Sequence, residues 1–453
     1  MSELGRMANF ALGLVRWLRQ KVDEKKIRES TLAAVPYAIA AGLVGLMAVA
    51  YAKLFQLAER SAMELFRSAP HMIFVVAPVA FLLSWWLVKK LAPAAGGSGI
   101  PQLMAAAELA GRDAPTVAPL LGARMFMVKT LSSLVCVLGG GAIGREGPTL
   151  QLAGSTFYLT HRFLKRVGSR YIPVAGLQSM IITGGAAGLA AAFNTPLGGI
   201  VYAIEELAKI HLSFFRTSLI HAVIVSGLVA QFMLGSYLYL GYPVVRAPEP
   251  AQLPAVILVA ALVGAGGALM GRALFRLGQA RKALSSQRSE IVFVAGVGLA
   301  FAGLAYFAGL PALGSGKEVL NELLFTETHA DWTWPVARLF GNLLSYGSGA
   351  AGGVFAPALA SGAALASLVS TFLPGLDPHM LVLIGMIAFL TGLTRTPFTS
   401  FVLVLEMTDR HSVILPMMIS AMAANAVAHL IEPESLYEKL KGGFLPQHVP
   451  EKS

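Results

Sequence analysis

Glu146 is a carboxylate inside a glycine-rich stretch, residues 139–150, that separates two apolar segments. The five glycines of this stretch let the backbone run exposed and close to other groups. Pro148 follows, and proline is favoured in the first turn of a helix, where its missing N–H costs nothing. The pattern predicts a broken helix whose new N-terminus offers N–H groups and partial positive charge to an anion. A carboxylate at that point can compete with the anion for its site, and it can also carry a proton.

A second break lies at residues 96–103, where Gly-Gly-Ser-Gly is followed by Ile-Pro-Gln-Leu. It opens a short helix that we expect to end at about Leu109. Ser98 stands at the position of a helix cap, so its hydroxyl either caps backbone N–H groups or lends its O–H to an ion. A third break, Gly353-Val-Phe-Ala-Pro357, offers backbone N–H groups of the same kind.

The elements that position these breaks are membrane spans. Of the 453 residues, 56% are hydrophobic and only 13% are charged, which is typical of a polytopic membrane protein. A span needs about 20 apolar residues. Runs without Asp, Glu, Lys or Arg occupy 30–52, 68–88, 171–204, 217–245, 250–271, 291–316, 339–376 and 411–431. The runs 171–204 and 339–376 are too long for one straight span and contain Gly and Pro, so we expect broken or paired helices there.

The net charge of +11 lies in short loops and does not indicate nucleic-acid binding. Segments 161–170 and 272–288 contain Lys and Arg but no acids, and residues 1–30 contain seven Lys and Arg. Segment 317–331 instead contains four acids and one Lys. The positive-inside rule places the basic segments in the cytoplasm and the acidic one outside. Residues 1–29 form a basic amphipathic segment, which we interpret as a helix on the cytoplasmic surface.

Part of the chain repeats at an offset of 201 residues. In both copies a Thr-Pro pair is followed, nine residues after the proline, by a glutamate. The corresponding residues are Gly184 and Gly385, Pro196 and Pro397, and Glu205 and Glu406. The glycine breaks before Pro148 and Pro357 also correspond in order. Paired Gly/Pro-broken segments predict two related halves with an ion site between them, and an inverted repeat would bring both helix N-termini together near the midplane.

These patterns divide the chain into five parts. We expect a cytoplasmic N-terminal helix at 1–29, a first transmembrane repeat at 30–215, an outward span with an extracellular loop at 216–250, a second repeat at 251–431, and a C-terminal pore helix with a short cytoplasmic tail at 432–453. The fold class is all-α, a polytopic membrane protein of two inverted helical repeats. A single cysteine, Cys136, excludes a disulfide within the chain and makes a cysteine metal site improbable.

Four motifs in this order carry a resemblance to a known family: Gly97-Ser-Gly-Ile-Pro101, Gly144-Arg-Glu-Gly-Pro148, Gly353-Val-Phe-Ala-Pro357, and Tyr437 after the last span. The chain closely resembles the CLC family of chloride channels and proton/chloride exchangers, over roughly residues 30–441. The resemblance implies an all-α homodimer with one pore in each subunit. It places the dimer surface on the helices around 196–232 and 397–430.

The resemblance also implies roles for individual residues. It assigns a central chloride to two hydroxyl groups and two backbone N–H groups, those of Ser98, Tyr437, Val354 and Phe355. It assigns an outer anion site to the backbone N–H groups of Arg145, Glu146 and Gly147. Glu146 would be the gating glutamate, which occupies an anion site when ionised and swings away when protonated. Glu206 would be the inner proton-transfer residue, and chloride would be the bound substrate, without a cofactor or a metal.

The sequence is also compatible with purely structural roles for several of these residues. Glu146 could be a structural partner of Arg145, and Tyr437 could be an aromatic anchor at the membrane interface. Glu205 and Glu206 lie four and three residues before Lys209, a spacing that suits a solvated helical pair. Lys129 either lies buried near the pathway or extends its ammonium to the inner interface.

The chain departs from its relatives at the short helix after Pro101. Bacterial exchangers of the family often carry acids there, whereas this chain has Gln102 and Met104. Serine at position 98 favours chloride, because the fluoride-selective branch has methionine there and plant nitrate exchangers have proline. The chain ends soon after Tyr437, so we expect it to lack the paired cytoplasmic regulatory domains of many relatives.

The sequence thus predicts a proton-coupled chloride antiporter of bacterial type, in the inner membrane, with both termini cytoplasmic. A passive chloride channel of the same fold is the alternative, and Glu206 argues against it, because channels of the family usually have an apolar residue there. An intramembrane enzyme or a receptor-like structural protein is a third class. The enzyme is disfavoured because the spans contain no nucleophile–base pair and no cluster of metal ligands.

Overall fold

The computed structural model describes residues 24–111, 114–167, 176–207, 216–235 and 238–446, and their regular structure is helical. The first half contains α2 (Glu24–Ser68), α3 (Ile73–Leu91), α4 (Ile100–Ala110), α5 (Ala118–Leu121), α6 (Ala123–Leu138), α7 (Glu146–Val167), α8 (Leu177–Phe193), α9 (Pro196–Tyr202) and α10 (Arg216–Leu234). The second half contains α11 (Leu253–Lys282), α12 (Gln287–Ala308), α13 (Lys317–Phe325), α14 (Thr333–Gly347), α15 (Phe355–Ser370), α16 (Pro378–Thr394), α17 (Pro397–Thr408), α18 (Ile414–Ile431) and α19 (Leu436–Lys441). The predicted all-α class is confirmed.

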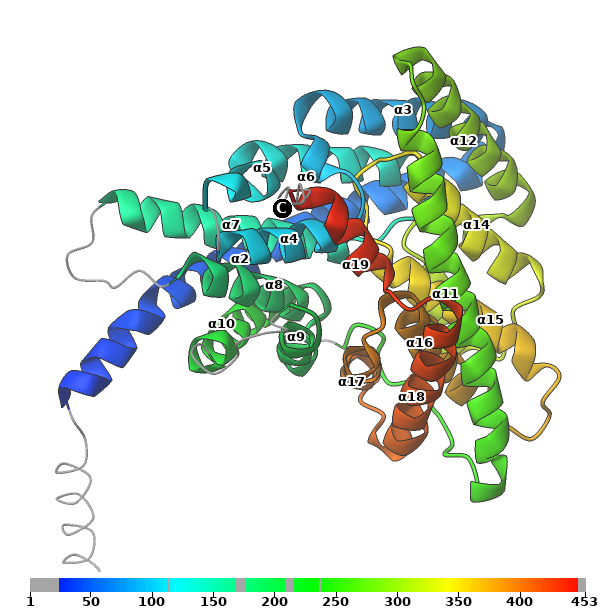
Figure 1. Ribbon diagram of the computed structural model, residues 1–453. Coiled ribbons are helices and arrows are strands. Elements are labelled where there is room, and N and C mark those ends of the chain that lie inside the picture. The colour runs from blue at the N-terminus through cyan, green and yellow to red at the C-terminus, as the bar shows by residue number, and fades with distance from the viewer. Residues whose placement is uncertain (1–23, 112–113, 168–175, 208–215, 236–237, 447–453) are drawn as a thin grey trace, which may run out of the picture.

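Long helices such as α2, α11 and α12 pack together with shorter ones such as α4, α9 and α17 (Figure 1). Within the described residues, six helices are long and apolar enough to cross a membrane. The two long uncharged runs are broken as expected, into α8 and α9 and into α14 and α15. The first helix extends further than its apolar run, because α2 continues past residue 52 to Ser68. Its charged continuation finds partners in the protein, since Glu59 accepts a hydrogen bond from the backbone N–H of Ser315 at 2.5 Å.

Two consecutive helices of each half match at the offset seen in the sequence. Helices α8 and α16 each have 17 residues. Each ends at a residue in the left-handed conformation, Asn194 with φ 56° and Arg395 with φ 62°. A Thr-Pro pair then opens α9 or α17. The equivalent glycines face equivalent neighbours, because Gly184 packs on α7 and Gly385 packs on Gly362 of α15. Small residues at these crossings let the helix backbones approach closely.

The two repeats are joined by a reciprocal pair of helix caps. The Glu406 carboxylate at the end of α17 accepts hydrogen bonds from the N–H groups of Leu197 and Gly198, at 3.0 and 2.8 Å, in the first turn of α9. The Glu205 carboxylate that follows α9 accepts from the N–H groups of Phe398 and Thr399, at 3.0 and 2.7 Å, in the first turn of α17. Each carboxylate therefore satisfies donors that the other helix leaves free.

Replacement of Glu406 by alanine is expected to destabilise the protein, because two N–H groups of α9 lose a charged acceptor. Such caps contribute about 1–2 kcal/mol, and hydrogen bonds to charged groups about 1.5–3 kcal/mol. Thermal unfolding in detergent should show a lower midpoint for this variant. The symmetric variant Glu205→Ala should lower it similarly, whereas the exposed Glu327→Ala serves as the control. An unchanged midpoint in both cap variants would contradict the reciprocal cap.

Several predictions concern residues outside the described ranges. Residues 1–23 of the predicted cytoplasmic N-terminal helix lie outside the described residues, and so does the C-terminal tail from residue 447. The division into five parts with the boundaries given above stays a prediction.

Candidate anion site

Three broken-helix loops meet at one point and are joined by backbone hydrogen bonds. The Gly97 N–H donates to the Ala350 carbonyl at 2.9 Å, and the Gly352 N–H donates to the Gly97 carbonyl at 3.0 Å. Gly144 and Gly353 exchange two bonds of 2.7 Å in an antiparallel bridge. The loops before α4, α7 and α15 therefore form one unit, although more than 200 residues separate the first from the last.

The N-termini of α7 and α15 face each other across this unit. Pro148 and Pro357 each occupy the third position of their helix, so Glu146 and Phe355 are equivalent first residues. The loop that leads into α15 touches the first turn of α7, because a Cβ on Gly353 would lie 3.0 Å from the backbone nitrogen of Gly147. The first N–H groups of a helix have no acceptor within it, and they carry partial positive charge. The predicted meeting of two helix N-termini is confirmed, and two such ends point at one small volume.

The Ser98 hydroxyl lies at the same point. A Cβ on Gly147 would lie only 2.4 Å from Ser98 Oγ, so the serine side chain touches the start of α7. The capping interpretation of Ser98 is wrong, because Gly99 occupies the N-cap position of α4 and no side chain caps that helix. Ser98 Oγ is buried and makes no hydrogen bond of normal geometry within the described part of the chain. Its O–H is available to a ligand.

Tyr437 brings a second hydroxyl to Ser98. Its side chain is fully buried in α19, which packs against α4 (Figure 1), so the alternative of an interfacial anchor is wrong. The Tyr437 and Ser98 hydroxyls interact with one another, but neither oxygen has a partner of normal hydrogen-bond geometry among the described residues. Helix α19 is held in place at its start by the Ser435 cap and at its end by an ion pair of 3.5 Å between Lys441 and Glu108.

The Glu146 carboxylate is fully buried among these groups. It folds back over its own loop, since a Cβ on Gly144 would lie 2.4 Å from Glu146 Oε2. It also interacts with the backbone N–H of Ala356 in the first turn of α15. Arg145 Nε lies 3.9 Å from Glu146 Oε1. The carboxylate therefore has the arginine partner considered above, and it also lies against the first turn of α15.

The neighbouring residues Glu205 and Glu206 have different surroundings. After α9 the helix widens into a π-helical turn, Ala203–Leu207, in which the Glu206 side chain is buried and Glu205 points to α17. Glu206 interacts electrostatically with Tyr202 and with Tyr437. Tyr437 in turn interacts with Glu146. Tyr437 is therefore close enough to both carboxylates to interact with each of them. Lys209, the partner considered for a solvated pair, lies outside the described residues.

Two buried side chains hold the loop before α4. Lys129 is fully buried, and its ammonium donates to the carbonyls of Ala95 and Gly97 at 2.9 and 2.6 Å. It does not extend to the interface. The Gln102 amide donates to the Gly96 carbonyl at 2.6 Å. Because these carbonyls are bound, the loop is kept rigid beside Ser98. No sequence pattern indicated this role for Gln102, since only the folded loop brings the amide back to a carbonyl six residues earlier.

Two cavities reach the site. One cavity, of about 270 Å³, is lined by Arg145, Glu146, Tyr239 and Lys317. The other, of about 910 Å³, is lined by Ser98, Gln102 and Glu290 among others. Glu146 lines the first cavity and Ser98 lines the second, so the two cavities end at neighbouring groups of the site.

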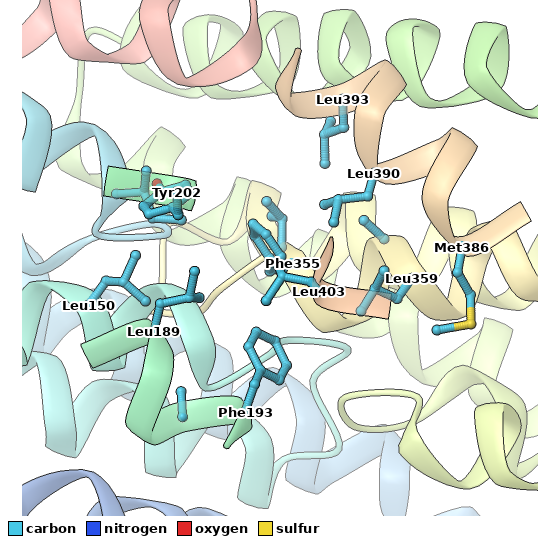
Figure 2. Close-up of a cluster of buried hydrophobic side chains, with 14 of the residues drawn as sticks. Leu150, Leu189, Phe193, Tyr202, Phe355, Leu359, Met386, Leu390, Leu393 and Leu403 are labelled. Carbon is cyan, nitrogen blue, oxygen red and sulfur yellow. The ribbon is translucent and has the colours of Figure 1, made fainter. Parts of the chain in front are cut away.

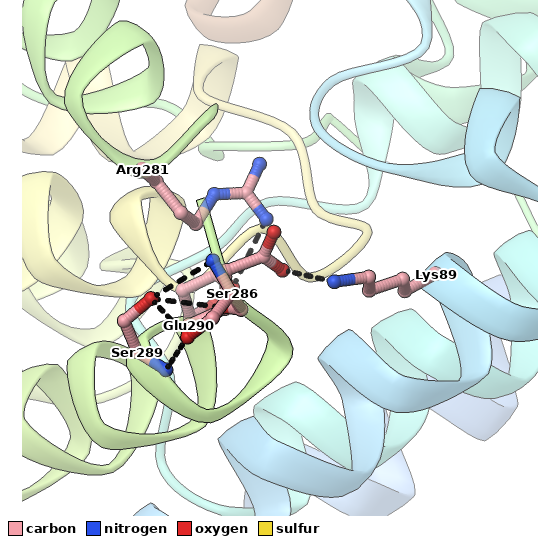
Figure 3. Close-up of polar contacts among 6 residues, drawn as sticks. Lys89, Arg281, Ser286, Ser289 and Glu290 are labelled. Atoms are coloured by element: carbon pink, nitrogen blue, oxygen red, sulfur yellow. Dashed lines mark hydrogen bonds and ion pairs between the residues drawn. The ribbon is translucent and has the colours of Figure 1, made fainter. Parts of the chain in front are cut away.

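The wall of the larger cavity is basic. Lys89, Arg124, Arg281 and Lys282 line it against the single acid Glu290. Figure 3 shows Glu290 between Arg281 and Lys89, with an ion pair of 2.7 Å to Lys89. Arg281 Nη1 lies 3.5 Å from the Ser348 carbonyl, in the loop that leads to α15. The excess of cations gives this cavity a potential that attracts anions.

Aromatic rings close the site on its other sides. Figure 2 shows Phe355 and Phe193 in the buried cluster, and their ring centroids are 6.0 Å apart. Tyr239 stacks edge-on against Phe193 at 5.0 Å and directs its hydroxyl to Glu146 Oε1 at 3.5 Å. Sequence reasoning missed Tyr239, because it stands in a loop without a motif. Among the described residues, no group of three or more His, Cys, Asp or Glu side chains could hold a metal ion.

Residues 79–429 match the family described as voltage gated chloride channel. The chain belongs to this family. It is 29% identical over 455 residues to the H(+)/Cl(-) exchange transporter ClcA of Yersinia pestis bv. Antiqua (strain Angola), covering 94% of this chain and 90% of that one. Among solved structures, its fold is similar to that of a slow cyanobacterial Cl-/H+ antiporter, with a TM-score of 0.80, 24% identity, and coverage of 92% of this chain and 99% of that one. A CLC-type fluoride/proton antiporter also has this fold, with a TM-score of 0.74, 19% identity, and coverage of 91% and 98%.

Proposed function

We propose that this protein is a proton-coupled chloride antiporter, which exchanges chloride for protons across the membrane. The observation that carries the proposal is the buried Glu146 carboxylate, which lies against two helix N-termini and lines one of the two cavities that reach the site. The family, and the exchange activity named for relatives that match over nearly the whole chain, support it.

Chloride is the substrate, and the chain's own dipoles bind it without a cofactor. The Ser98 and Tyr437 hydroxyls and the N–H groups of Val354 and Phe355 form the central site. The N–H groups of Arg145, Glu146 and Gly147 form the outer site. Hydroxyls and helix ends offer partial charges, so the ion is held weakly enough to leave again. The proposal is supported by the two buried hydroxyl oxygens that meet beside the starts of α7 and α15.

Glu146 couples the two fluxes. When ionised, its carboxylate takes the anion position and blocks chloride. When protonated, the carboxyl group loses its attraction to the helix ends. It then swings into the smaller cavity, which it lines, and lets chloride enter. A chloride ion and the deprotonated Glu146 carboxylate therefore compete for the same anion position. Each proton that binds to Glu146 frees this position for chloride.

Glu206 carries the proton on the cytoplasmic side of the site. Its carboxylate is buried and interacts electrostatically with Tyr202 and Tyr437. We expect the proton path to diverge from the chloride path, which runs through the larger cavity to Ser98. Gln102 and Met104 replace the acids of relatives on α4, and both side chains are buried there. The acid on this helix is Glu108, paired with Lys441.

The protein is a multi-pass membrane protein, and we place it in the bacterial inner membrane with both termini cytoplasmic. The basic cavity and the loop between α11 and α12 then face the cytoplasm, and the acidic α13 faces outward, as the positive-inside rule requires. The chain works as a homodimer in membrane lipid. Adjacent helices α9, α10, α17 and α18 support this, because they expose a set of large apolar side chains: Leu197, Ile220, Ile224, Leu228, Phe398, Leu415, Met418 and Met422.

The test is a paired measurement of chloride and proton flux in liposomes, under a chloride gradient without a pH gradient. The wild type is expected to drive protons uphill. Glu206→Gln is expected to abolish proton movement while chloride flux persists, because the amide cannot carry a proton but leaves the chloride path intact. The exposed Glu327→Gln is the matched control and should retain both fluxes.

Each other outcome has a defined meaning. Chloride flux without proton movement in the wild type would replace the antiporter by the passive channel of the same fold. Proton coupling that survives in Glu206→Gln would keep the antiporter but remove Glu206 from the proton path. The absence of chloride flux from a folded wild-type protein would overturn the chloride site.

A further inference from the structure

We propose that Tyr239 is a positioning residue that holds the Glu146 carboxylate in the anion pathway from the side of the smaller cavity. The inference rests on the proposed role of Glu146 and adds a residue that no motif indicated. Its basis is geometric, because the Tyr239 hydroxyl lies 3.5 Å from Glu146 Oε1 and both groups line the same cavity.

The ring of Tyr239 is fixed on several sides. Its edge-on contact with Phe193 has a centroid distance of 5.0 Å and an interplanar angle of 84°. The Lys317 ammonium lies 4.6 Å from the ring centroid, and the Arg145 guanidinium lies 5.8 Å from it. The next residue is tied to α17, since the Leu240 N–H donates to the Met407 carbonyl at 3.2 Å. Only 4% of Tyr239 is exposed, so its hydroxyl is directed by the packing of the ring.

Two cations beside one phenol ring change its chemistry. A cation near the ring is attracted by its π electrons and draws electron density from it. The phenol O–H thereby becomes a stronger hydrogen-bond donor. A donor to a carboxylate stabilises the ionised form over the protonated form. Tyr239 is therefore expected to favour the state in which Glu146 occupies the anion position, and to delay its release by protons.

Other charged or titratable groups also act on Glu146 from the elements around it. These groups are Arg145 beside it, Tyr51 and Glu59 of α2, Lys317 at the start of α13, and Tyr437 of α19. They remain unchanged when only the Tyr239 hydroxyl is removed. The Tyr239→Phe variant consequently isolates one donor while it keeps the ring, its packing on Phe193 and both neighbouring cations.

The experiment measures chloride flux in liposomes as a function of pH, with equal pH on both sides so that orientation has no influence. In Tyr239→Phe the carboxylate should be protonated more easily, so the flux should reach half its maximum at a pH about 0.5–1 unit higher than in the wild type. Lys317→Met should shift the profile in the same direction. The double variant should shift it by less than the sum of both, because the cation acts partly through the hydroxyl.

The matched control is Tyr242→Phe, in the same loop. Tyr242 is 61% exposed and its ring faces Arg410, so its profile should coincide with that of the wild type. A Tyr239→Phe profile that coincides with the wild type, or an equal shift in Tyr242→Phe, would overturn the role of Tyr239. These results are distinct from a failure of the proposed function, in which the wild type itself would show no chloride-driven proton movement.

Discussion

Replacement of Glu146 by glutamine is expected to abolish proton movement while chloride flux continues and no longer depends on pH. The amide has nearly the shape of the protonated acid, but it has neither a charge nor an exchangeable acidic proton. It cannot compete with chloride for the position at the helix ends, so the pathway stays open at every pH. The same liposome assay checks the result, with proton flux falling to the level of empty liposomes.

The matched control for this prediction is Glu322→Gln, which removes an exposed acid of α13. It should leave both fluxes and their pH dependence unchanged. If Glu146→Gln still moved protons against their gradient, the proton would bypass this carboxylate and the gating role would be wrong. If the variant lost chloride flux while remaining folded, the carboxylate would be needed for the structure of the site.

Replacement of Gly147 by alanine is expected to weaken chloride binding strongly. The new Cβ would lie 2.4 Å from Ser98 Oγ and 2.6 Å from the Ser98 carbonyl oxygen. Contacts this short force the loop before α4 away from α7, and both contribute to the predicted anion sites. Overpacking of this kind costs about 1–3 kcal/mol, which corresponds to a loss of affinity of about fivefold to 150-fold. Titration calorimetry of the detergent-solubilised protein with chloride measures this loss.

Gly42→Ala is the control for the added methyl group. No atom lies within 4 Å of a Cβ at this position, so chloride affinity should be preserved. Affinity equal to the wild type in Gly147→Ala would show that the Ser98 loop is not part of the anion site. A thermal unfolding measurement on both variants separates lost binding from general instability.

Much of the candidate site could be predicted from local patterns. Each break combines glycines with a proline, and this pairing ends one helix and starts the next without help from distant residues. The offset of 201 residues correctly related α8 and α9 to α16 and α17. The residue types at the breaks indicated anion chemistry, because helix N-termini and hydroxyls are the donors that suit a small anion. The roles of the individual residues in transport stay predictions that the variants above test.

Other features depend on contacts between distant segments. Glu205 and Glu206 are neighbours in sequence, and only the packing of α9 against α17 decides that Glu205 caps a helix while Glu206 is buried beside Tyr202. For Lys129, both a buried and an interfacial position were compatible with the sequence, and the carbonyls of Ala95 and Gly97 decided between them.

The sequence by itself determined where the helices break, which segments span the membrane and which residue types stand at the helix ends. These follow from backbone conformation and hydropathy, which act over a few residues. Only the tertiary structure decided which ends meet, which carboxylate is buried, and that Tyr239 reaches Glu146 from 93 positions away along the chain. These depend on how helices pack, because a side chain's partners across a helix interface leave no regular pattern in the local sequence.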